Sequence, residues 1–184
     1  MLLYVPVGLD LSLTSTGIAI GDSTWAIDGR NLRGARRLVH IRDRILEAIA
    51  NHDDYTAPVV ALVEGYSFSS RNSHAHALGE LGGVVRVALH EVAVPVIEVP
   101  PTCRAKFATG RGNASKSEVT SSVSARTGIV WDGIGNEDRC DAWLLQEMAF
   151  ARMGHARFKW PATHLAALDK IDWDLMPLGV KEAL

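Results

Sequence analysis

Two acidic residues end hydrophobic segments of the kind that form buried strands. Asp10 follows the apolar residues 2–9, and Glu64 follows the β-branched run 59–63. A charged group at the end of a buried strand loses hydration, which is unfavourable unless a partner compensates for the loss. Taken singly, Asp10 could instead cap a turn, and Glu64 could be a solvated loop residue. Their matching positions make both of them candidates for one shared site.

Two further acidic residues lie near the start of the last clear helical pattern, about residues 136–152. Asp138 and Asp141 are three residues apart, so they share one face of a helix. That face continues into Leu145 and Met148 and is therefore the apolar face. Taken singly, either aspartate could simply complement the helix macrodipole. The pattern predicts that both point toward the sheet from the buried edge of the helix.

Four carboxylates that meet at one place repel each other, and the sequence suggests no Arg or Lys between them. Such a cluster binds protons or divalent cations. Oxygen ligands alone suit Mg²⁺, and Mn²⁺ is expected to substitute for it. A carboxylate site that holds two such ions serves phosphodiester hydrolysis, because one ion activates water and the other stabilises the leaving oxygen.

A basic segment and an aromatic loop offer contacts for a nucleic acid. Residues 100–126 hold five basic residues and one acidic residue, and glycines at 110 and 112 let the backbone approach phosphates closely. The segment could also be a solvated loop. After Glu64 comes a loop whose exposed aromatic could stack on a base or could pack in the core. The candidate DNA-binding residues are Phe68, Arg71, Arg104, Lys106, Arg111 and Lys116.

Composition sets the class of protein. The 184 residues suffice for one well-cored domain, and 47% hydrophobic with 22% charged residues is typical of a soluble globular chain. A formal net charge of −2 means that any attraction for nucleic acid must come from a local patch. No apolar run is long enough to span a bilayer. The two separate cysteines, Cys103 and Cys140, fit a reducing cytoplasm and no disulfide scaffold.

Strand and helix patterns alternate along the chain, which predicts an α/β fold with a mixed sheet. Strands are expected at 2–10, 18–20, 24–27, 59–63 and 95–99, and helices at 32–49, 74–92, 117–126 and 136–152. Residues 102–117 are interpreted as a polar, basic segment. The helix at 74–92 is apolar on two faces, and one of these is expected to contact a second copy of the chain.

Four motifs in the same order make the sequence resemble the RuvC family of Holliday-junction resolvases, within the RNase H-like superfamily. The motifs span about residues 5–152. The first is Val7-Gly8-Leu9-Asp10-Leu11-Ser12 with Thr16-Gly17, and the second is Val63–Phe68 with Leu78–Gly83. The third runs from Pro100 and Lys106 to Gly110–Lys116, and the fourth is Asp138-Arg139-Cys140-Asp141-Ala142. The resemblance implies an RNase H-like α/β fold with a mixed five-stranded sheet and helices on both faces. The expected domains are a nuclease domain at 1–153 and a C-terminal extension at 154–184.

The resemblance also implies a function. The protein would be a homodimer, joined through the helix at about 74–92, that makes paired cuts in four-way DNA junctions. Asp10, Glu64, Asp138 and Asp141 would be the catalytic residues and the Mg²⁺ ligands. Alternatives with the same carboxylates are a flap or fork nuclease and an RNA–DNA hybrid nuclease. Two further alternatives are an ATP-binding protein of the actin-like superfamily and a junction-binding module without catalysis.

Overall fold

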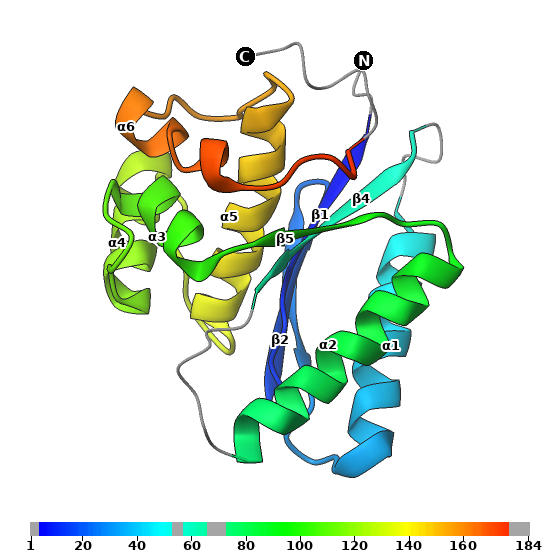
Figure 1. Cartoon of the computed structure of the whole chain (residues 1–184). Coiled ribbons are helices and arrows are strands. Elements are labelled where there is room, and N and C mark those ends of the chain that lie inside the picture. Colours follow the sequence, from blue (N-terminus) through cyan, green and yellow to red (C-terminus); the bar gives the residue numbers. More distant parts are fainter. Residues whose placement is uncertain (1–3, 53–56, 66–72, 177–184) are drawn as a thin grey trace.

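The computed structural model describes residues 4–52, 57–65 and 73–176, and it contains one mixed sheet (Figure 1). The five strands are β1 (Val5–Asp10), β2 (Ser15–Ile20), β3 (Ser23–Asp28), β4 (Val59–Glu64) and β5 (Val96–Val99). They lie in the order β3-β2-β1-β4-β5. β1, β4 and β5 are parallel, whereas β2 is antiparallel to both of its neighbours. The mixed five-stranded sheet with a hairpin first is thus confirmed.

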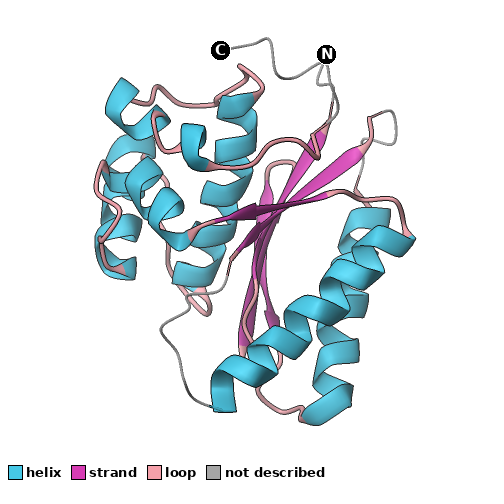
Figure 2. Cartoon of the chain, viewed as in Figure 1, coloured by secondary structure: helices cyan, strands magenta, loops and turns pink. Residues whose placement is uncertain are grey.

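Helices cover both faces of this sheet (Figure 2). On one face lie α1 (Gly34–Ala50) and α2 (Ser73–Glu91). On the other face lie α3 (Pro101–Thr109), α4 (Lys116–Thr127) and α5 (Asn136–Arg152), followed by α6 (Ala162–Leu165) and a short 3₁₀ turn at Leu168–Lys170. In the part of the chain that the structure describes, no helix is long and apolar enough to cross a membrane.

The sheet separates two hydrophobic cores, and β4 shows how one strand serves both. Val60 and Leu62 pack into the core beneath α3, α4 and α5. Ala61 and Val63 point to the opposite face and pack into the core beneath α1 and α2. A strand buried on both faces reads as a continuous apolar run, as the central β4 sequence does.

Helix α5 lies against the sheet with almost no space between their backbones. A Cβ added at Gly8 on β1 would overlap the carbonyl oxygen of Ala142, and one added at Gly17 on β2 would overlap that of Asp138. Only glycine permits this close approach. The predicted apolar face is confirmed, because Leu145 and Met148 are fully buried. The start of α5 is therefore held directly over the ends of β1 and β2.

Residues 154–176 complete the core around α5. Glu147 on α5 is fully buried, and its carboxylate accepts hydrogen bonds from the backbone N–H of Arg157, from Arg157 Nε at 2.8 Å and from Trp160 Nε1 at 3.0 Å. Trp160 in turn packs against Phe107 of α3, with the two rings tilted and their centroids 4.3 Å apart. The described part of the C-terminal extension is thus tied to both α5 and α3.

A helix lies inside the segment at 102–117 that is interpreted from its sequence as polar and basic. α3 begins at Pro101, a residue suited to the first turn of a helix, and is terminated by Gly110 in the left-handed conformation, with φ of 80°. Five of its residues are buried, among them Arg104. The local composition predicts an exposed segment, whereas packing against α5 buries one side of it.

Candidate metal and nucleic-acid site

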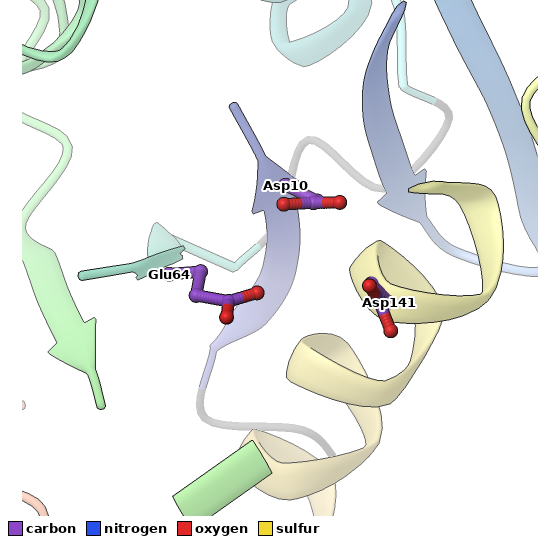
Figure 3. Close-up of side chains that lie close together, drawn as sticks. All are labelled: Asp10, Glu64 and Asp141. Carbon is purple, nitrogen blue, oxygen red and sulfur yellow. The ribbon is translucent and has the colours of Figure 1, made fainter. Parts of the chain in front are cut away.

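Three of the four predicted carboxylates meet at one edge of the sheet. Asp10 ends β1, Glu64 ends β4 and Asp141 lies on the second turn of α5, and all three side chains point into the same space (Figure 3). One carboxylate oxygen of each lies within 4.8 Å of the other two. Their side chains are 11%, 13% and 1% exposed. This spacing allows one cation to contact all three.

The sheet register explains why Asp10 and Glu64 are neighbours. β1 and β4 are adjacent and parallel, and the last paired residues are Leu9 and Val63. Asp10 and Glu64 each follow by one residue, so their side chains leave the same edge of the sheet. Beyond Asp10 the chain turns tightly, because the Thr16 hydroxyl donates to the Ser12 carbonyl and accepts from the Ser12 N–H, at 2.6 and 3.1 Å.

The expectation that no basic side chain lies among the carboxylates is wrong. Arg104, on α3, forms an ion pair with Glu64 at 2.8 Å and another with Asp141. Its side chain is 7% exposed. The Arg104 guanidinium therefore faces the carboxylates and not the protein surface, and its predicted contact with DNA stays a prediction.

Lys116 brings Asp138 into the cluster. The Lys116 ammonium, at the first residue of α4, lies 3.3 Å from an oxygen of each of Asp10, Asp138 and Asp141. α4 begins here because Ser115 and Glu118 form a capping box, in which each side chain accepts from the other residue's backbone N–H. Asp138 is at the rim of the cluster, with its side chain 21% exposed.

Burial makes the central carboxylates harder to ionise. Desolvation raises the pKa of Asp10 to about 6, against the lowering effect of Lys116. Desolvation likewise raises the pKa of Asp141 to about 6, although Arg104 and Lys116 oppose it, and it raises the pKa of Glu64. The pKa of Lys116 is raised, because the three aspartates outweigh the effect of its burial. Two buried acids that titrate near neutrality are typical of a functional site.

The donor set fits a divalent metal ion. Glu64 Oε2 and Asp141 Oδ2 are buried oxygens that make no hydrogen bond of good geometry, and each lies within ion-pair distance of a protein cation, Arg104 Nε and Lys116 Nζ respectively. Buried carboxylates call for a positive charge beside them, which a divalent ion can supply. Ligation by carboxylates alone favours Mg²⁺ or Mn²⁺ over zinc or copper. Asp10, Glu64 and Asp141 would hold the ion, with Asp138 at its side.

The remaining candidate DNA-binding residues are not gathered in the cluster. Lys106 is half-buried on the last turn of α3, and Arg111 is exposed and paired with Glu118 at 2.6 Å. Phe68 and Arg71 lie outside the described residues. Sequence reasoning missed Arg104 as a partner of the carboxylates. The signal available for it was the Pro100-Pro101 pair, which marks a helix start and so places Arg104 on a helix and not in a loop.

Known proteins resemble this chain in sequence and in fold. No protein-family profile matches it. It is 37% identical over 91 residues to the "Crossover junction endodeoxyribonuclease RuvC" of Sorangium cellulosum, a match that covers 50% of this chain and 49% of that protein. The matched segment thus spans about half the length of the curated relative.

Solved structures of RuvC share the fold. The structure of Thermus thermophilus RuvC matches with a TM-score of 0.63 and 25% identity, covering 84% of this chain and 99% of that one. T. thermophilus RuvC in complex with a Holliday junction substrate matches with a TM-score of 0.62 and 23% identity, over 85% and 99% of the two chains. The RNase H-like fold and the resemblance of this chain to the RuvC family are therefore confirmed, by sequence over half of its length and by structure over most of it.

Proposed function

We propose that this protein is a metal-dependent endonuclease that resolves four-way DNA junctions by hydrolysing phosphodiester bonds. The observation that carries the proposal is the convergence of Asp10, Glu64 and Asp141 within 4.8 Å at the edge of a RuvC-like sheet. RuvC relatives in sequence and structure support the choice of substrate class. Asp10, Glu64, Asp138 and Asp141 are the proposed catalytic residues.

The buried and the exposed residues of the site are proposed to have different roles. Mg²⁺, when bound, would activate water and stabilise the charge that develops on the phosphate. Asp10, Glu64 and Asp141 are held too rigidly by β1, β4 and α5 to adapt to a substrate, so their role is to fix the ion. Asp138 and Lys116 are the more exposed members of the cluster. Asp138 would contact the ion from the side open to solvent, and Lys116 would face an approaching phosphate.

DNA is proposed to lie across the surface formed by the end of α3, the turn at 110–115 and the start of α4. Lys106, Arg111 and Lys116 come from this segment, and their charges would contact the phosphate backbone. Phe68 and Arg71 are proposed to contact DNA from the loop after Glu64. The residues at 1–153 are proposed to form the nuclease domain, with 154–184 as an extension that supports α5. A DNA substrate and two free cysteines also fit a cytoplasmic protein.

A homodimer through α2 is proposed because, among the residues that the structure describes, its outer face includes an exposed valine and a glycine with open space beside it. Leu81, Val85 and Leu89 are fully buried against the sheet and α1. On the outer side Val87 is 59% exposed, and a Cβ added at Gly83 would meet no atom within 4 Å. A small-residue helix face of this kind allows close approach of a second helix. Two copies would place two carboxylate sites on one junction, as paired cuts require.

Incubation with a panel of labelled substrates tests the activity. Four-way junctions, flaps, forks, linear duplexes and RNA–DNA hybrids are each treated with the protein and Mg²⁺ or Mn²⁺. We expect paired cuts in the four-way junction, and we expect Asp10→Asn to abolish them. Asp22→Asn is the matched control, because Asp22 is an exposed aspartate outside the cluster.

Each other outcome has a definite meaning. Faster cleavage of flaps, forks or hybrids than of junctions would replace the proposed substrate and keep the chemistry. Junction cleavage by Asp10→Asn that equals the unmodified protein would refute the carboxylate mechanism. Light scattering tests the dimer. Val87→Glu should yield monomers, whereas Val92→Glu, at an exposed position just after α2, should not.

A further inference from the structure

The Lys116 ammonium lies where a cation would be bound by three carboxylates. Its Nζ atom is 3.3 Å from Asp10 Oδ2, from Asp138 Oδ1 and from Asp141 Oδ2. These oxygens come from β1 and from two successive turns of α5, and Lys116 is the cation they share. An ion that takes Asp141 Oδ2 as a ligand must therefore enter the space that the ammonium fills.

Arg104 holds the other side of the same carboxylate. It contacts Asp141 Oδ1 and pairs with Glu64 Oε2 at 2.8 Å. Both oxygens of Asp141 are thus paired with cations of the protein itself. Since a divalent ion and a protein cation at the same oxygen repel each other strongly at short range, binding of the ion must remove one of them.

The two cations differ in their freedom to leave. The Arg104 side chain is 7% exposed and lies between α3 and the sheet, so its departure would leave a buried cavity and two unpaired carboxylates. The Lys116 side chain is 45% exposed, and its flexible stem begins at the first residue of α4. Lys116 can rotate into solvent without disturbing the core, whereas Arg104 cannot.

We propose that Lys116 occupies the place of a divalent ion in the free protein and is displaced by that ion, while Arg104 remains as a fixed counter-ion of Glu64 and Asp141. The displaced ammonium moves outward to the surface proposed to receive phosphate, so loading with metal also releases a positive charge for DNA. The inference rests on the proposed metal-dependent function and adds an order of events to it.

Binding of Mn²⁺ in the absence of DNA tests this directly. Electron paramagnetic resonance measures free Mn²⁺ during titration of the unmodified protein, of Lys116→Met and of Lys159→Met. Lys116→Met removes a positive charge that competes with the ion for the carboxylates. The variant should therefore bind Mn²⁺ at least about tenfold more tightly than the unmodified protein. Lys159→Met is the matched control, because it removes the same charge from an exposed lysine in the C-terminal extension, and its affinity should not change.

A crystal structure with Mn²⁺ locates the ion by its anomalous scattering. We expect the ion on Asp10 and Asp141, with the Lys116 ammonium out of contact with these two carboxylates and with Asp138. Mn²⁺ bound elsewhere with Lys116 still in place, or an affinity of Lys116→Met equal to or weaker than that of the unmodified protein, would overturn the inference and leave the proposed nuclease intact. No Mn²⁺ binding by either protein would overturn both.

Discussion

Replacing Arg104 by methionine should destabilise the free protein in a way that depends on pH. The change leaves Glu64 and Asp141 without their buried partner, at 13% and 1% exposure. Removing one member of a buried ion pair costs about 3–5 kcal/mol when the other remains charged. We expect a loss of unfolding free energy of this size at pH 8, which is well above the pKa of about 6 of Asp141.

Lowering the pH should relieve most of that loss. Arg104 lowers the pKa of both Glu64 and Asp141 against the larger effect of burial. Without it these pKa values rise further, so both acids take up protons in the folded state as the pH falls from 8 to 5. An acid whose pKa is higher in the folded state than in the unfolded state destabilises the fold at a pH above its folded pKa. The effect disappears at a pH below its unfolded pKa. At pH 5 we expect a loss below about 2 kcal/mol.

Urea unfolding at the two pH values, without metal, measures both quantities. Arg111→Met is the matched control, because Arg111 is 63% exposed and its ion pair with Glu118 lies at the surface. That variant should lose no more than about 1 kcal/mol at either pH. An equal loss for Arg104→Met at pH 5 and pH 8 would refute the electrostatic reasoning and assign Arg104 a packing role only.

Three further predictions concern the carboxylates and the helix above them. Asp10→Asn should stabilise the free protein at pH 8 by about 1–3 kcal/mol, because the folded pKa of Asp10, about 6, exceeds its ordinary value of 3.8. The gain in stability should vanish below pH 4. A lower free energy of chemical unfolding for the variant at pH 8 would contradict the prediction. Mn²⁺ affinity of the unmodified protein should fall as the pH drops through 6, where protons compete for Asp10 and Asp141; calorimetry that shows no change between pH 5 and 7.5 would count against these ligands. Gly17→Ala should lower the free energy of unfolding by at least about 3 kcal/mol and weaken Mn²⁺ binding, because the new methyl group overlaps the backbone of α5 at Asp138. A melting temperature equal to that of the unmodified protein would disprove that contact.

The strand ends and the last helix could be predicted from sequence because their signals are local. A β-branched run that stops at Glu64 and a shared face for Asp138 and Asp141 need only the geometry of a strand and of a helix. The alternation of strands and helices predicts a mixed sheet. It does not predict that β1 and β4 are adjacent, because the order of the strands is a property of the tertiary fold.

The position of Arg104 could not be predicted in this way. Its partners are 40 and 37 residues away in the chain, and no local pattern distinguishes a buried arginine from a solvated one. The surrounding glycines and basic residues favoured an exposed segment. The bonds of Glu147 with Arg157 and Trp160 were missed for the same reason. The sequence after 153 has no periodicity, and residues 154–176 owe their arrangement to the surface they cover.

The contact of α5 with β1 and β2 limits how such a protein can change. Backbone meets backbone at Gly8 and Gly17, so α5 cannot come closer to the sheet without a steric clash that no side chain can absorb. The scaffold therefore sets the smallest distance between the first aspartate and the last two. Changes of ligand preference are therefore expected in the surface segments that surround the carboxylates, and redesign of the site is best confined to them.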